Sequence, residues 1–445
     1  MNTKLRADAD AIIQSAIAAV LPDAAVARAL EKLPPPAGRL VLVAAGKAAW
    51  QMAKAAREVL AQRASPLHGG IVITKYGHVK APLPGILCRE AGHPVPDAAG
   101  FAATAEALAL VRGLGAQDAV LFLLSGGGSA LFEAPLIPGE ELQAVTAQLL
   151  ACGADITEMN TVRKRLSAVK GGRFAEACAP ANVFGVVLSD IVGDPLDMIA
   201  SGPAVPDSTT CADALAVAEK YDLILSDAAR ECLAQETPKT LANVENRITG
   251  SVRQLCAAAA QAAAERGYTP VLLTDCLTCQ AKEAGSFLAS ILRTHAARKP
   301  GEKLAFLAGG ETVVRLTGKG LGGRNQELAL AAAAGIDGMA NAAVFSGGSD
   351  GTDGPTDAAG GYADGDTAAA LRAARTTAYP QGAEIWQVLE DNDAYHALQA
   401  MDGLLFTGPT GTNVNDVAVA LLGYRSAKEP YIRFHTGTSF RKQPE

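Results

Sequence analysis

Short runs of valine, leucine, isoleucine and alanine recur along the chain, and most are continuous rather than alternating in polarity. Continuous hydrophobicity predicts strands that are covered on both faces, as in parallel α/β sheets. Loops of small or charged residues and Ala-rich helical stretches separate these runs. The predicted strands are 40–45, 70–74, 86–90, 119–124, 183–188, 270–273, 304–308, 342–345 and 404–406. The pattern therefore predicts an α/β fold.

The chain is long enough for more than one hydrophobic core, because 445 residues exceed the usual size of a single domain. A polar stretch at 235–250 separates two helix-rich regions, which predicts domains at 1–240 and 241–445. Residues 4–31 read as one or two Ala-rich helices, and packing of the first on the second domain stays open.

Polar loops follow most of the predicted strands, in both halves of the chain. In open α/β sheets, ligands bind outside the carboxyl ends of the strands. These loops carry glycine, hydroxyl and charged residues. The sequence therefore predicts a ligand site in a cleft between the two domains.

Carboxylates are concentrated in the glycine-rich loop after strand 342–345, which contains Asp350, Asp353 and Asp357. Three carboxylates this close repel one another unless a positive charge lies among them, either a magnesium ion or Lys and Arg side chains. The spacing excludes an EF-hand. The alternative is an Asx-rich turn with solvated carboxylates. Asp190, at the end of strand 183–188, is a further candidate metal ligand or general base.

Two loops of the first half have the features of anion sites. Lys47 opens a helix directly after a strand, where free N–H groups and the helix dipole favour a phosphate or carboxylate. The loop after strand 119–124 can form a nest of backbone N–H groups with two hydroxyls. Its residues are Ser125, Gly126, Gly127, Gly128 and Ser129. The alternatives are a solvated lysine and a tight turn.

Basic residues are concentrated in 160–173 of an otherwise acidic protein. Such a stripe suits an acidic substrate or a polyphosphate. At helical spacing one face collects Asn160, Arg163, Ser167 and Lys170. Lys164 and Arg165 point elsewhere and are expected to be solvated.

The second half repeats the arrangement of strand, polar loop and helix. Glu311 lies at a strand end, and Arg324 and Asn325 start a helix that Glu327 could cap. Arg324 suits bidentate recognition of a phosphate or carboxylate. A later loop supplies candidate nucleotide or phosphate donors in Thr410, Thr412 and Asn413.

Charge and cysteine content narrow the class of partner. The formal charge of −7 and the pI near 5.5 argue against binding of nucleic acid or of an anionic membrane. No apolar run is long enough to span a bilayer. Eight scattered cysteines suggest a reduced, cytoplasmic protein, and the pair Cys276 and Cys279 lacks the partners of a zinc site. His93 is expected to be a turn residue.

Eight motifs, taken in order, resemble the glycerate 2-kinases of the MOFRL type. They are AAGKAAWQMA, EAGHPVPD, SGGGSALFEAP, NTVRKRLSAVKGGR, SDIVGDPLDMIASGPAVPD, GGETVV with GGRNQELAL, SGGSDGTDGPTDAAGG and TGPTGTNVNDVAVAL. The resemblance implies ATP- and Mg²⁺-dependent phosphorylation of glycerate to 2-phosphoglycerate. It also implies a Rossmann-like N-terminal domain, a smaller α/β domain and a site between them, with Lys47, Arg324 and Asp350 as site residues.

These roles form a hypothesis about phosphoryl transfer, which needs positioning and charge neutralisation more than covalent chemistry. Lys47 and Arg324 would neutralise the γ-phosphoryl group and the glycerate carboxylate. Asp190 and Asp350, with Asp353, would hold Mg²⁺ or take the proton of the C2 hydroxyl. A homodimer stays open.

Two other functions remain as alternatives. Members of the family linked to tartrate breakdown are often labelled hydroxypyruvate reductase, but no strand is followed by the G-x-G-x-x-G pattern of an NAD(P)H-dependent enzyme. The second alternative is a non-catalytic protein that binds sugar phosphates.

Overall fold

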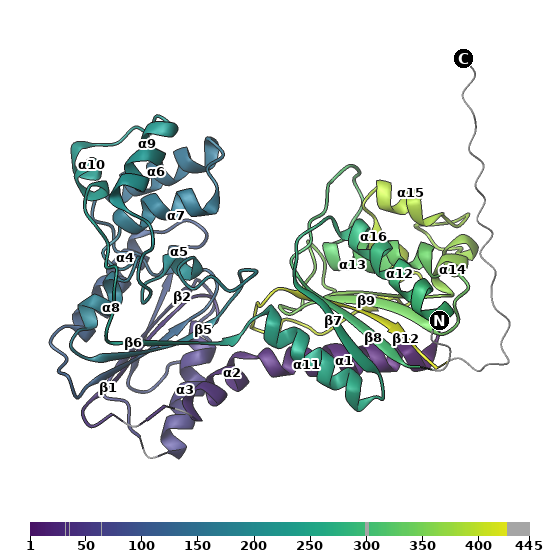
Figure 1. The fold of residues 1–445 in the computed structure, drawn as a ribbon, viewed down its shortest axis with the longest axis horizontal. Coiled ribbons are helices and arrows are strands. Elements are labelled where there is room, and N and C mark those ends of the chain that lie inside the picture. Colours follow the sequence, from purple (N-terminus) through teal and green to yellow (C-terminus); the bar gives the residue numbers. More distant parts are fainter. Residues whose placement is uncertain (32, 35, 64, 299–301, 425–445) are drawn as a thin grey trace.

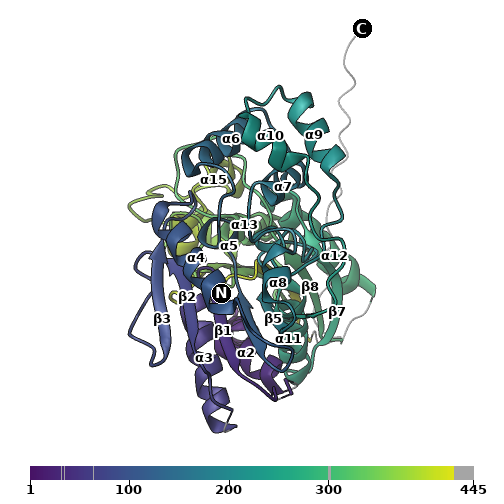
Figure 2. The ribbon, with the colours of Figure 1, turned by 90° about the vertical axis from the view of Figure 1, so that its left-hand side faces the viewer.

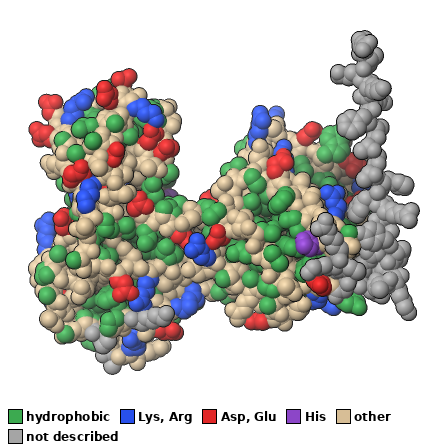
Figure 3. All heavy atoms as spheres, in the orientation of Figure 1, with side chains coloured by type: hydrophobic (Ala, Val, Ile, Leu, Met, Phe, Trp, Pro, Cys, Tyr) green, Lys and Arg blue, Asp and Glu red, His purple; other side chains and the backbone are tan. Residues whose placement is uncertain are grey.

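Two six-stranded sheets form two domains that lie side by side in the computed structural model (Figure 1). The structure describes residues 1–424 apart from 32, 35, 64 and 299–301. In the space-filling view the domains are separate lobes with an open groove between them (Figure 3). Residues 425–445 of the second predicted domain lie outside the described residues.

The first sheet is entirely parallel, as predicted. Its strands, in the order β3-β2-β1-β4-β5-β6, are β1 (Leu40–Ala45), β2 (Gly70–Lys75), β3 (Ile86–Ala91), β4 (Ala119–Leu124), β5 (Asn182–Leu188) and β6 (Val244–Gly250). This is the Rossmann order, in which the connections reverse direction between β1 and β4 and leave a crevice at the carboxyl ends of these strands.

Helices cover both faces of the first sheet. Residues of α2 (Pro22–Glu31) and α3 (Ala49–Gln62) bury one face. Residues of α4 (Ala98–Val111), α5 (Gly128–Leu131), α8 (Arg173–Cys178) and the 3₁₀ helix η1 (Ile199–Ser201) bury the other.

A separate helical cluster stands above the first sheet and has its own apolar core. It contains α6 (Gly139–Ala151), α7 (Ile156–Arg165), α9 (Cys211–Lys220) and α10 (Asp227–Leu233). Figure 2, in which the first domain faces the viewer, shows α6, α9 and α10 together above the strands.

The second sheet is mixed, so the prediction of a parallel sheet is wrong for this half. Its strands, in the order β11-β10-β9-β12-β8-β7, are β7 (Thr269–Leu277), β8 (Leu304–Gly310), β9 (Ala342–Gly348), β10 (Gly360–Asp364), β11 (Leu404–Leu405) and β12 (Asp416–Leu422). Only β7 and β8 pair in parallel. Because helices cover both faces of the sheet, the inner strands β8, β9 and β12 are fully buried and as continuously apolar as parallel strands.

The helices of the second sheet separate into two layers. On one face, α1 (Thr3–Val20) and α11 (Val252–Glu265) pack against the strands. On the other lie α12 (Ala281–Arg298), α13 (Arg324–Gly335), α14 (Thr367–Ala373), α15 (Ile385–Glu390) and α16 (Ala394–Gln399).

The chain passes between the two sheets twice, after α1 and after β6. The first helix therefore belongs to the second domain, where Ile12 and Ile13 are buried against α11 and the sheet. Strand β6 pairs with β5, so the first domain extends beyond the predicted boundary at residue 240 and ends at Gly250. The polar sequence of β6, an edge strand whose residues are mostly only half-buried, hid it from the hydrophobic pattern.

Among the described helices, none is by itself both long and apolar enough to cross a membrane. The helices α1 and α2 pass that test of length and composition only as a pair, and they are bent by 52° relative to each other.

Packing of α1 on the second domain predicts a stability effect. Ile12 is completely buried, so Ile12→Ala should leave a cavity and lower the free energy of unfolding by about 2–5 kcal/mol. The matched variant Ile12→Val should cost only about 0.5–1.5 kcal/mol. Urea unfolding of both variants measures the difference, and an alanine variant as stable as the valine variant would contradict this packing.

Candidate active site

The first wall of the site is formed by the loops after β1 and β4, at the crevice of the first sheet. The backbone N–H of Lys47 donates to the carbonyl of Gly126 at 2.9 Å, and the N–H of Ala48 donates to Oγ of Ser125 at 3.0 Å. Gly46 has a φ of +122°, and a Cβ there would lie 2.3 Å from Oγ of Ser125. Only glycine allows the two loops to lock together in this way.

This locking corrects one detail of the predicted anion site. The N–H groups of Lys47 and Ala48, which precede α3, donate to protein acceptors, so these two are not free for a phosphate. The side chain of Lys47 makes no ion pair within the described residues, and the N–H groups of Gly126 and Gly127 have no acceptor there. These three donors are the ones that could bind an anion.

Three polar side chains pack around the glycine turn. A Cβ on Gly126 would lie 2.1 Å from Oδ2 of Asp190. A Cβ on Gly127 would lie 3.2 Å from Cγ of Lys47 and 3.0 Å from Cδ2 of His93. The absence of side chains on the turn thus lets Lys47, His93 and Asp190 gather at one point.

Burial dominates the electrostatics of this wall. It raises the pKa of Asp190, and the charge of Glu311 adds to this rise, while Lys47 opposes it. Burial and the charge of Lys47 both lower the pKa of His93, which favours a neutral ring. His93 lies in a bend, as expected, and its ring also lies beside the glycine turn of the candidate site.

The second wall centres on Arg324, the first residue of α13. Its Nε and Nη2 donate to the two oxygens of Asp416 at 2.5 and 3.1 Å, and its Nη1 donates to Glu311 at 2.7 Å. A Cβ on Gly348 would lie 3.1 Å from Oδ1 of Asp350 and 3.3 Å from Oδ1 of Asp416. Arg324 and three carboxylates therefore share this wall.

Charge pairing fixes the ionisation of the Arg324–Asp416 pair. Burial disfavours the charge on Arg324, but its hydrogen bond to Asp416 and the nearby carboxylates hold the pKa of Arg324 above its usual value. Burial raises the pKa of Asp416, and Arg324 opposes that rise. The guanidinium is thus held in place as a permanent cation.

Asn415 joins the two walls. Its side-chain Nδ2 donates to the backbone carbonyl of Asp190 in the first domain and to Oε2 of Glu311 in the second, each at 3.1 Å. The Asn415 backbone has a φ of +65°, and its side-chain oxygen is buried and accepts no hydrogen bond from the residues that the structure describes. The loops of both domains therefore meet at one point, as the cleft hypothesis requires.

Two other predicted residues support the first wall from behind. Arg163 donates to the backbone carbonyl of Ser129 at 3.1 Å. The Asn160 side chain accepts a hydrogen bond from Ser201, whose hydroxyl lies 3.4 Å from that of Ser129. Both residues hold the end of the glycine turn in position.

Lys170 lies elsewhere than predicted. Helix α7 ends at Arg165, so Lys170 is not on its face but forms a fully buried ion pair with Glu133. The prediction that Lys164 and Arg165 are solvated is also wrong, because both are buried beside Asp207, at 3.1 and 3.5 Å. The spacing of charged residues along the sequence cannot predict ion pairs that tertiary packing forms and buries.

Asp353 and Asn325 are occupied by the start of α13. Asp353 is buried and its two oxygens accept from the N–H groups of Asn325 and Gln326 at 3.2 and 2.9 Å. Asp353 therefore performs the capping predicted for Glu327. The side chain of Asn325 bonds to Asp353 and Ser346 and is buried.

The loop before β12 supports the acidic loop of the second wall. The Thr410 hydroxyl donates to the carbonyl of Ser349 at 2.6 Å, and its N–H donates to the carbonyl of Asp350 at 3.2 Å. The side-chain oxygen of Asn413 accepts from the N–H of Asn415 at 3.4 Å. These residues position Asp350 and Asn415.

Sequence reasoning missed Asn415 and Asp416. Asp416 precedes an apolar run, which would place it at the amino end of a parallel strand and away from the site. Because β12 is antiparallel, its first residue pairs with Gly310 and Gly348 at the carboxyl ends of β8 and β9. An expectation of mixed pairing could have identified it.

Comparison with known proteins decides the family. Residues 8–234 match a family described as a domain of unknown function, DUF4147, and residues 304–416 match the MOFRL family. The D-glycerate 2-kinase of Thermotoga maritima is 50% identical over 92% of this chain and 97% of its own length. This chain belongs to the family of MOFRL-type glycerate 2-kinases.

Solved and named relatives agree with this family. The crystal structure of glycerate kinase from Thermotoga maritima has a TM-score of 0.88 and 49% identity, and the match covers 94% of this chain and 100% of that one. A relative from Agrobacterium vitis that carries the label hydroxypyruvate reductase is 40% identical over 93% of both chains. The family thus contains both labels, as expected.

Burial of Asp353 predicts a pH-dependent stability. Burial raises its pKa from 3.8 to about 6, against the lowering effect of the N–H groups of Gln326 and Asn325. Between these values the folded protein binds the proton more tightly than the unfolded chain, so stability falls as pH rises through this window. The neutral variant Asp353→Asn should therefore gain about 3 kcal/mol relative to the wild type between pH 3.5 and pH 7.

Denaturant unfolding at several pH values measures this difference. If the free energies of unfolding of the wild type and the variant change in parallel between pH 3.5 and pH 7, burial of the Asp353 carboxylate does not destabilise the folded protein.

Proposed function

We propose that this protein is a glycerate 2-kinase that transfers the γ-phosphate of ATP to the C2 hydroxyl of glycerate. One observation carries the proposal. The side-chain amide of Asn415 links Asp190 on the first wall to Glu311 on the second, so Lys47 and Arg324 lie on opposite sides of one polar cleft. Phosphoryl transfer requires such convergent cations more than it requires a covalent catalyst.

The first wall supplies anion donors. The Lys47 ammonium and the N–H groups of Gly126 and Gly127 would bind the glycerate carboxylate or the transferring phosphoryl group. Arg163 and Asn160 keep the turn in place through Ser129 and Ser201. These residues of the first wall bind and orient the anion.

The second wall supplies a fixed guanidinium. Arg324 uses three of its five N–H donors on Asp416 and Glu311, so two remain for phosphate oxygens. Because its carboxylate partners hold the side chain in place, little rotamer freedom is lost when a phosphate binds.

Asp190 is suited to take the proton of the C2 hydroxyl. Its carboxylate contacts the glycine turn, and burial raises its pKa, which makes it a stronger base than an exposed aspartate. We assign it this role.

We assign Mg²⁺ to Asp350. Among residues 1–424, outside the gaps noted above, no group of three His, Cys, Asp or Glu side chains forms a ready metal site. Mg²⁺ usually takes only one or two carboxylates together with phosphate oxygens, so Asp350 fits this need. One of its oxygens accepts from the N–H of Thr352 at 3.1 Å, which orients the other. Bound Mg²⁺ would neutralise the phosphate charge.

The alternative function, NAD(P)H-dependent reduction of hydroxypyruvate, has less support than the kinase activity. The first sheet has the Rossmann order, but β1 is followed by Gly46 and Lys47 rather than by a G-x-G-x-x-G turn. We also propose a cytoplasmic location, which the eight free cysteines favour.

Lys47→Ala tests the site most directly. Loss of this charge should lower kcat about 10²–10³-fold, because the ammonium acts mainly on the transferring phosphoryl group. Lys54→Ala is the control. Lys54 lies on α3, the helix that follows Lys47, is half-exposed and pairs with Glu58, so this variant should keep wild-type turnover. NMR of the product from glycerate and Mg-ATP measures both rate and product. Oxidation of NAD(P)H by hydroxypyruvate in place of 2-phosphoglycerate formation would disprove the proposed function.

The role of Asp350 has its own test. Asp350→Asn should raise the Mg²⁺ concentration needed for half-maximal activity by about tenfold, because one charged ligand is lost. Asp357→Asn is the matched control, since Asp357 belongs to the same loop but is exposed and bonded to Tyr395. Equal Mg²⁺ dependence in the two variants would remove Asp350 from the metal site.

A further inference from the structure

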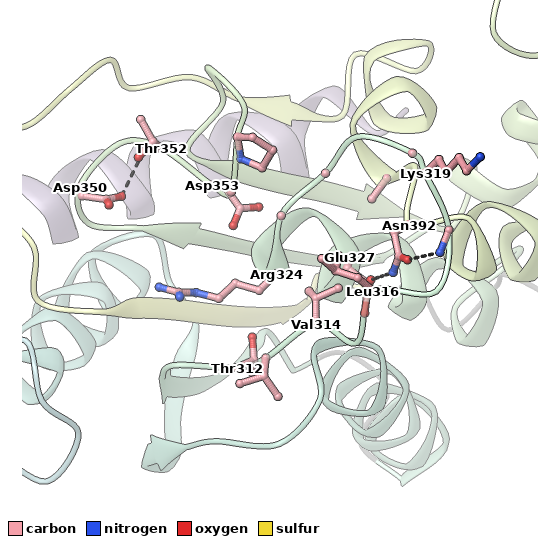
Figure 4. A pocket seen from close by; sticks show the side chains of 18 residues that line it. Thr312, Val314, Leu316, Lys319, Arg324, Glu327, Asp350, Thr352, Asp353 and Asn392 are labelled. Carbon is pink, nitrogen blue, oxygen red and sulfur yellow. Dashed lines mark hydrogen bonds between the residues drawn. The ribbon is translucent and has the colours of Figure 1, made fainter. Parts of the chain in front are cut away.

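A cavity of about 660 Å³ lies in the second domain beside Arg324 and Asp350. Loop 312–323, the start of α13 and loop 350–355 line it. Figure 4 shows Arg324 and Asp350 at one end of the cavity and Lys319 and Asn392 at the other. The volume lies in the range that holds nucleotide-sized ligands, and it is far larger than a three-carbon acid requires.

The loop that forms one side of this cavity is firmly built. Oδ1 of Asn392 accepts from the N–H groups of Thr317 and Gly318 at 2.7 and 2.9 Å. A Cβ on Gly318 would lie 2.2 Å from Cα of Asp391. A Cβ on Gly320 would lie 2.4 Å from Cβ of Asp393 and 2.6 Å from the carbonyl oxygen of Asp391. Glycine at these positions lets the loop press against residues 391–393, and the cavity keeps its shape.

The same loop exposes apolar side chains that nothing covers within the described residues. Leu316 is 81% exposed and Val313 is 53% exposed, and both line the cavity. Exposed apolar groups at the edge of a pocket with a few convergent polar groups are typical of a ligand site. A flat aromatic base would cover both side chains.

The floor of the cavity carries a buried carboxylate, that of Glu327. It accepts from Nδ2 of Asn392 at 3.3 Å and from the backbone of Lys282. A carboxylate offers about four acceptor positions, so it can bind a further donor from a ligand. The cavity therefore combines an apolar rim, an acceptor inside and a guanidinium at the end nearest the cleft.

The first domain offers the nucleotide no equivalent place. In sheets of Rossmann order, a dinucleotide pyrophosphate lies on the N-terminus of the helix after the first strand. Here the N–H groups of Lys47 and Ala48 donate to Gly126 and Ser125 instead. Two of the donors at this turn are thus already used within the protein, which favours the other wall for the nucleotide.

We propose that this cavity binds the adenosine part of ATP, with the base against Val313 and Leu316 and its exocyclic amine donating to Glu327. The triphosphate then runs past Arg324 into the cleft. The assignment rests on the proposed function for its choice of nucleotide. Guanine presents a carbonyl oxygen where adenine has its amine, so a carboxylate at this position selects ATP over GTP.

Leu316→Asp tests the apolar rim. Calorimetric titration of the full chain with ADP should show binding at least about tenfold weaker than in the wild type, because a charge replaces the surface that contacts the base. Ile224→Asp is the matched control, since Ile224 is also 81% exposed but lies in the first domain. ADP affinity that is equal in the two variants would overturn the proposal.

Glu327→Gln tests the acceptor. A glutamine amide can accept or donate, so the ratio of kcat/KM for ATP over GTP should fall by about tenfold, while KM for glycerate stays unchanged. An unchanged ratio would show that Glu327 only supports the loop and would overturn its assigned role.

The two experiments separate this proposal from the proposed function. If wild-type protein binds ADP in a Leu316-dependent way but makes no 2-phosphoglycerate, the kinase assignment fails and the cavity assignment stands. If it phosphorylates glycerate with ADP affinity independent of Leu316, the cavity assignment fails and the kinase assignment stands.

Discussion

The hydrogen bonds of the Asn415 side chain are the constraint on which the site depends. One amide group reaches a backbone carbonyl of the first domain and a carboxylate of the second. The left-handed backbone of Asn415 and its unpaired, buried oxygen both cost free energy, of the order of 1–3 kcal/mol each. Asparagine adopts this conformation more readily than most residues. This strained residue is the one whose side chain holds the two walls of the polar cleft together.

The charge balance of the cleft is an argument for the divalent cation that we propose. Two cations, Lys47 and Arg324, face four carboxylates, those of Asp190, Glu311, Asp350 and Asp416. A triphosphate and glycerate add only negative charge, and burial makes that charge more costly than it is in water. Mg²⁺ bound with the triphosphate would offset this excess, and Mg²⁺ needs only one or two protein carboxylates for this.

The sequence allowed prediction of the features that depend on local chemistry. Nine strands followed from apolar runs, whereas β6, β10 and β12 were not predicted. Polar loops at strand ends led to Lys47, Asp190 and Arg324, the residues on which the proposed site rests. Strand direction could not be predicted, because β12 is as apolar as a parallel strand when helices cover both its faces. The role of Asp416 was hidden for the same reason.

The other errors concern charges whose partners are distant in sequence. Lys170 is neutralised by Glu133, and Asp353 caps a helix that begins before it in the chain. Spacing along a helix cannot reveal either contact, because both are created by tertiary packing. A charged residue in a motif therefore indicates that a charge is needed, without indicating whether the ligand or the fold needs it.

The first sheet has the strand order of dinucleotide-binding proteins, but the loops at its crevice differ from theirs. Its strand order leaves a crevice between β1 and β4, the place where a dinucleotide usually binds. Oγ of Ser125 and the carbonyl of Gly126 accept from the N–H groups of Ala48 and Lys47, just before the helix that would hold a pyrophosphate. The Lys47 ammonium and the N–H groups of Gly126 and Gly127 stay available for an anion. This arrangement supports our proposal that the crevice binds the reacting groups and that the opposite wall binds the nucleotide base.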